Sequence, residues 1–129
     1  MESHPLVYLR ADGNDDIATG HLMRCLSIAR ALRRRKAVAA FIVSDSLSVS
    51  LLTDMFTPQE RADRAFPILQ LQTDYKNPDQ ELPAMQSILS AHNAAAVLVD
   101  SYFATPGYLS ALQKLTCTAY IDDLQAFDP

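Results

Sequence analysis

The 129 residues suffice for one domain with a hydrophobic core, and 49% hydrophobic against 20% charged residues excludes a disordered protein. A net charge of -4 argues against a general nucleic-acid binder. Two distant cysteines, Cys25 and Cys117, fit neither a disulfide framework nor a zinc module, so we predict reduced, buried thiols. No apolar run approaches the ~20 residues of a membrane span and no signal peptide is visible, so we expect a cytoplasmic protein that does not enter a membrane.

Short apolar runs typical of buried strands alternate with stretches of helical periodicity along the chain. The pattern predicts strands at residues 6–10, 39–44, 68–71, 95–100 and 117–121. Helices are predicted at residues 20–36, 46–56, 78–92 and 105–115, with Pro58 helping to end the second and Thr105 capping the last. This order predicts an α/β fold, a single domain over residues 1–129 with a parallel sheet of about five strands and helices on both faces.

The polar loop after the first predicted strand holds two of the three glycines, Gly13 and Gly20. We expect each to adopt a positive φ or to allow a close backbone approach. Their spacing excludes a dinucleotide fingerprint, and the absence of Gly-Lys-Ser/Thr excludes a P-loop. The free N–H groups of the helix that begins at Gly20 would favour an anion or a developing negative charge.

His21 falls in the first turn of that helix, where the positive end of the dipole favours a neutral ring. A neutral imidazole is what a general base requires. The alternative is a surface histidine that only hydrogen-bonds the loop. Arg24, three residues later, either clamps a phosphate or carboxylate or pairs with a nearby carboxylate, of which the loop offers Asp12, Asp15 and Asp16.

Polar residues also follow the two later strands. Asp100 and Tyr102 come after the strongest predicted strand and could hydrogen-bond a polyhydroxylated ligand, or Asp100 could cap a loop across which Tyr102 packs. Asp122 and Asp123 follow the last strand and could bind a cation, although turn chemistry is commoner.

Two further patterns have simpler interpretations. The basic run at residues 33–36 ends a helix and predicts a solvated face rather than a nucleic-acid site. Met23 and Met85 are expected in the core.

Several of these stretches resemble a known family. The segments are RADGN at residues 10–14, Ile17, GHLMRCL at 20–26, VDSY at 99–102 and IDD at 121–123. Together they resemble the UDP-sugar hydrolases of pseudaminic acid biosynthesis, whose relatives include proteins labelled as spore-coat polysaccharide biosynthesis proteins. Those enzymes act on UDP-2,4-diacetamido-2,4,6-trideoxy-β-L-altropyranose. Ala18 departs from the family pattern, which usually has glycine there.

The resemblance implies a GT-B fold, in which two Rossmann-like domains face a cleft, related to inverting glycosyltransferases. His21 would activate water for inverting attack at the anomeric carbon with UDP leaving, in the service of nonulosonic acid or surface polysaccharide synthesis. No metal or other cofactor is implied. The residues expected on the substrate side are Asp12, Gly13, Asn14, Gly20, Arg24, Asp100, Tyr102 and Asp123.

The resemblance also implies that a C-terminal domain holds most of the UDP. That domain is expected to be absent from this chain, which would then fold alone but hydrolyse little UDP-sugar.

Three alternatives remain at this level. The domain could be half of a glycosyltransferase, with an acceptor hydroxyl in place of water. It could be a non-catalytic module that pairs with a separate partner. It could also be a receiver-like signalling domain, although no lysine follows the last predicted strand.

Overall fold

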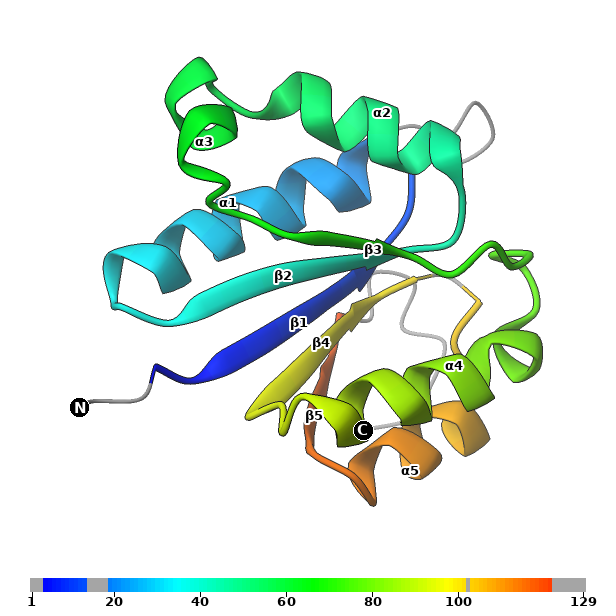
Figure 1. Ribbon diagram of the computed structural model, residues 1–129. Coiled ribbons are helices and arrows are strands. Elements are labelled where there is room, and N and C mark those ends of the chain that lie inside the picture. The colour runs from blue at the N-terminus through cyan, green and yellow to red at the C-terminus, as the bar shows by residue number, and fades with distance from the viewer. Residues whose placement is uncertain (1–3, 14–18, 102, 122–129) are drawn as a thin grey trace.

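The chain folds as a parallel sheet covered by helices on both faces (Figure 1). The computed structural model describes residues 4–13, 19–101 and 103–121. Its five strands lie in the order β3-β2-β1-β4-β5. They are β1 (Leu6–Ala11), β2 (Val38–Val43), β3 (Ile68–Gln70), β4 (Ala96–Asp100) and β5 (Cys117–Tyr120). The predicted α/β class and all five predicted strands are confirmed, with ends that differ by at most one residue.

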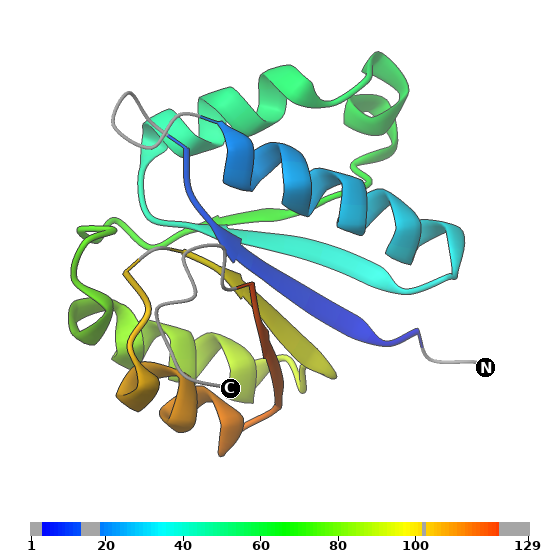
Figure 2. The same cartoon turned by 180° about the vertical axis from the view of Figure 1, so that it is seen from behind.

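Five helices connect these strands in the described part of the chain. They are α1 (Gly20–Arg34), α2 (Ser46–Met55), α3 (Pro58–Asp63), α4 (Pro78–Ala91) and α5 (Pro106–Gln113). The first three cover one face of the sheet, and α4 and α5 cover the other (Figures 1 and 2). Helices on both faces explain why the strands are continuous apolar runs rather than alternating ones.

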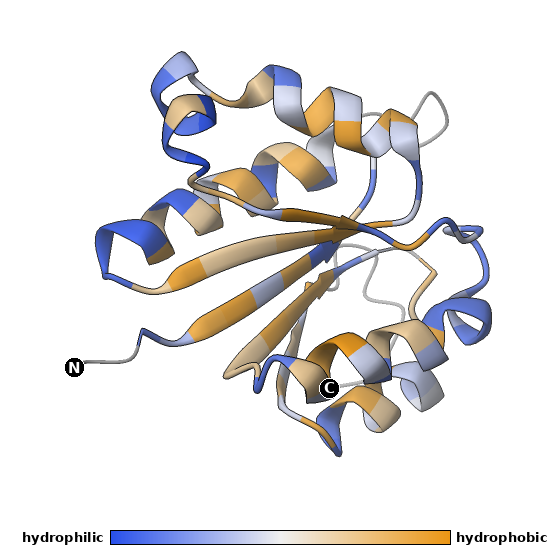
Figure 3. Cartoon of the chain, viewed as in Figure 1, coloured by the Kyte–Doolittle hydropathy of each residue, from blue (hydrophilic) through white to orange (hydrophobic). Residues whose placement is uncertain are grey.

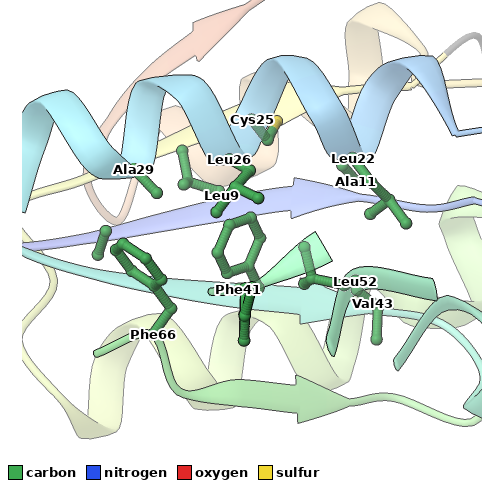
Figure 4. Close-up of a cluster of buried hydrophobic side chains, with 12 residues drawn as sticks. Leu9, Ala11, Leu22, Cys25, Leu26, Ala29, Phe41, Val43, Leu52 and Phe66 are labelled. Atoms are coloured by element: carbon green, nitrogen blue, oxygen red, sulfur yellow. The ribbon is translucent and has the colours of Figure 1, made fainter. Parts of the chain in front are cut away.

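Strand alternation divides the core between the two faces. Leu9 and Phe41 point toward α1 and α2, where they pack with Leu22, Leu26 and Leu52 (Figure 4). The neighbouring strand residues point the other way, into a second cluster with α4 and α5 that includes Tyr8, Ile42, Val97, Val99, Met85 and Leu112. Each face therefore has its own core. Successive residues of a strand point to opposite faces, so a residue's position along the strand determines which helices it contacts.

The helix α3 was not predicted. Pro58 is its first residue rather than only the end of α2. The side chain of Thr57 accepts a hydrogen bond from the backbone N–H of Glu60, whose carboxylate accepts one from the N–H of Thr57. The sequence Thr-Pro-Gln-Glu is the signature of this reciprocal capping box. A helix of only six residues is too short to show a clear helical periodicity, so the capping box is its main local signal.

Two burial predictions were wrong and two are confirmed. Met85 and Cys25 are fully buried, but Met23 is 57% exposed and Cys117 is exposed. Met23 lies on the outer side of α1, because Leu22, Cys25 and Leu26 form its buried face. Cys117 begins β5, which is an edge strand.

The strand order distinguishes between α/β topologies. The observed order 3-2-1-4-5 is that of Rossmann folds, whereas receiver domains have the order 2-1-3-4-5. The receiver-like alternative is therefore wrong. The order reverses between β1 and β4, where Ala11 and Asp100 are paired in register at the carboxyl ends of the strands. Ligands of such sheets bind at this switch point.

Candidate functional site

A buried carboxylate at the switch point joins β4 to the start of α1. Oδ1 of Asp100 lies 2.5 Å from Nδ1 of His21 and accepts a hydrogen bond from Nη2 of Arg24 at 2.6 Å. Its Oδ2 accepts a second bond from Nε of Arg24 at 2.8 Å. Arg24 thus donates to both oxygens of the carboxylate, in the bidentate geometry that makes such ion pairs strong.

Local structure explains how these side chains meet. Val97 and Val99 face α4 and α5, so strand alternation turns Asp100 toward α1. On α1, His21 and Arg24 are three residues apart and share one side of the helix. The sequence placed each residue on its element correctly, but the pairing depends on β4 lying next to β1.

Among the described residues, the start of α1 has no side-chain cap. Thr19 precedes the helix but its side chain makes no capping hydrogen bond, and the first turn contains no acidic residue. Gly20 has no positive φ, and a Cβ there would meet nothing within 4 Å. The expectation of a strained or closely approached backbone at Gly20 was therefore wrong. Within the described residues, neither Thr19 nor a side chain at position 20 covers the positive end of the helix.

Burial and hydrogen bonding oppose each other at Asp100, which is 1% exposed. Burial raises the pKa of its carboxyl group, but the hydrogen bonds from His21 and Arg24 outweigh burial, so the pKa lies below its usual value. Asp100 is therefore an ionised acceptor at neutral pH.

Cys25 lies on the same side of α1, with its Sγ 3.8 Å from Oδ2 of Asp100. Burial, and then the charge of Asp100, raise the pKa of this thiol to about 12. A thiol so far from its ionisation range is a poor nucleophile, which agrees with its prediction as a buried apolar group.

This arrangement can orient a histidine as a base. A carboxylate at Nδ1 selects the tautomer with the proton on that nitrogen and places the basic lone pair on Nε2. It also stabilises the imidazolium that forms when the ring accepts a proton, as in catalytic triads. The tautomer is assigned from this hydrogen bond.

The structure resolves several of the alternatives left open by the sequence. His21 is 4% exposed and is not a surface histidine. Arg24 does form an ion pair with Asp100, whereas Asp12 of the first loop pairs with Arg10. Asp100 caps no loop in the described structure, because both of its oxygens are engaged by α1.

Two residues predicted on the substrate side, Asp12 and Gly13, form their hydrogen bonds with other residues of the chain. Asp12 is 5% exposed, pairs with Arg10 at 2.9 Å and accepts a hydrogen bond from the N–H of Ser44 at 2.7 Å. The backbone N–H and C=O of Gly13 both bond the hydroxyl of Ser48, at 3.1 and 2.9 Å. These contacts hold the end of β1 to Ser44, before α2, and to Ser48, in the first turn of α2, which is a supporting role for the site.

Sequence reasoning missed a second buried polar cluster on the other face of the sheet. Arg10 donates from Nε and Nη2 to the two oxygens of Glu81 on α4, both at 2.8 Å. The hydroxyl of Tyr108 on α5 donates to Oε2 of Glu81 at 2.6 Å. An arginine in an otherwise apolar strand is the signal for such a cluster, because a buried charge needs a partner.

Other candidates lie outside the described residues. These are Asn14, Tyr102 and Asp123 among the substrate-side predictions, and Asp15, Asp16, Ala18 and Asp122 among the other residues singled out.

The described ranges contain neither a metal-binding cluster nor a membrane-spanning helix. No group of three or more histidine, cysteine, aspartate or glutamate side chains there could hold a metal ion. No helix within the same ranges combines the length and the apolar character that a bilayer crossing requires.

Comparison with known proteins adds one finding. No protein-family model and no curated protein matches the chain. The chain is similar to the solved structure of LpCGTa in complex with UDP, with a TM-score of 0.55 and 18% sequence identity over 88% of this chain. The two structures share the Rossmann-like α/β fold over this region. The match covers 27% of LpCGTa, so this Rossmann-like domain spans about a quarter of that chain, and at such identity the likeness establishes the fold alone.

Proposed function

We propose that this domain is the catalytic-side half of a UDP-sugar hydrolase. Nε2 of His21 accepts a proton from water, and the water oxygen attacks the anomeric carbon. The bond from that carbon to the UDP oxygen breaks, UDP leaves with the electron pair, and the anomeric configuration inverts. The products are UDP and a free sugar for nonulosonic acid or surface polysaccharide synthesis.

The observation that carries this proposal is the contact between His21 and Asp100 at the switch point. This histidine is buried and held at Nδ1 by an ionised carboxylate. Such a constraint suits a general base, whose effect depends on its geometry. Arg24 holds the carboxylate in place and, being partly exposed, can also meet an anionic group of the ligand.

The motifs supply the substrate class. They resemble those of hydrolases acting on UDP-2,4-diacetamido-2,4,6-trideoxy-β-L-altropyranose, and LpCGTa, which has a similar fold, was solved with UDP. We propose a cytoplasmic enzyme in which a second domain, facing the edge that carries His21, holds most of the UDP. The residues of this chain alone would then fold but turn over little substrate.

A glycosyltransferase is the second candidate, because the family that the motifs resemble is related to inverting glycosyltransferases and the fold is similar to that of LpCGTa, solved with UDP. The same base would then deprotonate an acceptor hydroxyl instead of water. Product analysis separates the two candidates, since hydrolysis in ¹⁸O-labelled water yields a free sugar labelled at the anomeric oxygen and transfer yields an unlabelled glycoside.

The role of His21 is tested with the His21→Ala variant in the full natural protein. We expect UDP release from the UDP-sugar to fall by about 10²–10⁴-fold, because proton transfer in the transition state is lost. Binding of UDP, measured by calorimetry, should stay within about twofold. His92→Ala is the matched control, since His92 is an exposed histidine at the end of α4. A His21→Ala protein with near-wild-type turnover would refute the assignment.

A further inference from the structure

A concentration of arginines lies at the end of the molecule opposite His21. Seven of the 11 basic residues fall in residues 30–36 and 61–64, although the chain as a whole is acidic. The end of α1 and the helix α3 lie together at the amino end of the sheet, where the ribbon is largely hydrophilic (Figures 1 and 3). The contact between them is direct, because Arg30 donates to both oxygens of Glu60 at 2.8 and 2.9 Å.

Two grooves flank this contact. One, of about 400 Å³, lies along α1 and is lined by Arg30, Arg33 and Arg34. The other, of about 580 Å³, lies between α3 and β3 and is lined by Arg61 and Arg64 among others. Glu60 and Phe66 line both grooves, and we call the two grooves together the arginine trough.

The trough carries more positive charge than its own carboxylates neutralise. Glu60 is paired with Arg30, and Asp63 is paired with Arg33 at 3.2 Å. No ion pair joins Arg34, Arg61 or Arg64 to any carboxylate in the described part of the chain, and all three are exposed. A helix end explains the run on α1, but it does not explain the two arginines that α3 and its C-cap contribute.

The floor of the trough is apolar and recessed. Phe56 and Phe66 line the larger groove and are 8% and 5% exposed, with their ring centroids 5.6 Å apart. A flat bilayer surface cannot reach rings set below charged side chains. Single-stranded nucleic acids stack on exposed aromatic faces, which these rings do not offer.

We propose that the arginine trough binds an acidic polypeptide segment whose carboxylates pair with Arg34, Arg61 and Arg64 while its apolar side chains fill the groove over Phe66. Charge complementarity sets the partner's sign, and the recessed apolar floor requires side chains that a phosphate backbone lacks. The site lies away from the edge that carries His21, so occupancy of the trough leaves that edge accessible.

The test uses a pool of short fluorescent peptides that alternate glutamate with leucine or phenylalanine. Fluorescence polarisation should show binding that weakens as salt rises to ~0.15 M. Replacing Arg34 and Arg64 together by glutamate should weaken it about tenfold or more, since each reversal turns an attraction into a repulsion. The matched control, Lys76→Glu with Lys114→Glu, makes the same change in net charge elsewhere and should alter the affinity less than twofold.

A second variant separates binding from folding. Arg64 has a left-handed backbone, with φ 51 and ψ 46, in which glycine is favoured. Arg64→Gly should therefore leave the unfolding midpoint unchanged or raise it, and it should still lower the affinity for the peptides.

Four results would overturn the proposal. The first is no binding of the peptide pool at millimolar concentration, and the second is equal affinity for peptides that carry glutamine in place of glutamate. The third is a loss of affinity in the lysine control variant equal to that in the arginine variant. The fourth is binding of phosphatidylglycerol vesicles or single-stranded DNA by a protein that does not bind the peptides.

Discussion

At the scale of single residues, Asp100 determines what the candidate site can do. It is almost fully buried, and its two oxygens accept from a histidine and an arginine of the same helix. A carboxylate in this position does not touch the substrate in our proposal. It sets the tautomer of His21 and balances the charge that appears on the ring, so it acts as a positioning residue.

Asp100→Asn should therefore lower turnover far more than ligand binding. In the full natural protein we expect kcat to fall on the order of 10²–10⁴-fold, because an amide neither selects the tautomer nor stabilises the imidazolium. Steady-state kinetics with calorimetric binding of UDP gives the comparison. Cys25→Ser is the control, since it changes a neighbour of Asp100 without altering the charge, and it should retain most of the activity. Equal effects of the two substitutions would contradict the assignment.

Asp100 also predicts a dependence of stability on pH. Its pKa is lower in the folded than in the unfolded state, so its contribution is present above the unfolded value of about 3.9 and is lost as pH falls through the folded value. The difference in free energy of unfolding between wild type and Asp100→Asn should therefore shrink on acidification from pH ~7 to ~3. Urea unfolding at a series of pH values measures it. A difference that stays constant or grows would show that the carboxylate is not stabilised by its partners.

At the scale of elements, the first turns of two helices position His21 and Glu60. The first turn of α1 holds His21 beside the carboxyl end of β4, and the side chain of Thr19 does not cap that helix. The start of α3 is the opposite case. It is closed by Thr57 and Glu60, and Glu60 in turn anchors Arg30 of α1. The hydrogen bonds from Arg30, followed by those at the cap, lower the pKa of Glu60 to about 2 despite its burial.

Removing the cap of α3 should destabilise the domain. We expect Thr57→Ala to lower the free energy of unfolding by about 1 kcal/mol, because the N–H of Glu60 loses its acceptor. Urea denaturation followed by circular dichroism measures the loss. Thr57→Ser keeps the hydroxyl and should stay within about 0.5 kcal/mol of wild type. If serine proved as costly as alanine, packing of the methyl group rather than the cap would be responsible.

At the scale of the whole molecule, two buried polar clusters hold the layers together at the carboxyl edge of the sheet. Asp100 ties β4 to α1 on one face. Arg10 ties β1 to α4 on the other, through Glu81, which also accepts from Tyr108 of α5. The carboxyl ends of the strands are thus fixed to helices of both layers, so a base mounted there has a rigid support.

The pair of Arg10 and Glu81 should be strongly coupled. Glu81→Leu alone is expected to cost about 3–5 kcal/mol, because it leaves a buried guanidinium without its main partner. Adding Arg10→Met should recover at least about 2 kcal/mol of the summed single losses.

A double-mutant cycle by urea denaturation gives this coupling energy. The exposed pair of Arg33 and Asp63 serves as the control cycle and should give at most about 1 kcal/mol. Equal coupling in the two cycles would mean that burial adds nothing at Arg10.

Much of this architecture could be read from local patterns. Apolar runs and helical spacing predicted all five strands and four of the five helices seen in the described residues, because both periodicities follow from backbone geometry within a few residues. His21 was placed in the first turn of its helix for the same reason. The six-residue helix α3 was not predicted, because its local signal is a capping box rather than a helical periodicity of apolar residues.

The partners of the polar side chains were beyond such patterns. Asp100 meets His21 across 79 positions, and Arg10 meets Glu81 across 71. Neither contact has a local signature, because each depends on β4 lying beside β1 and on which face each strand residue points to. The residue types and their elements follow from the sequence, since short-range periodicity encodes them. Whether Arg24 would hold a ligand or a carboxylate of its own chain depended on long-range strand order, which local patterns leave open.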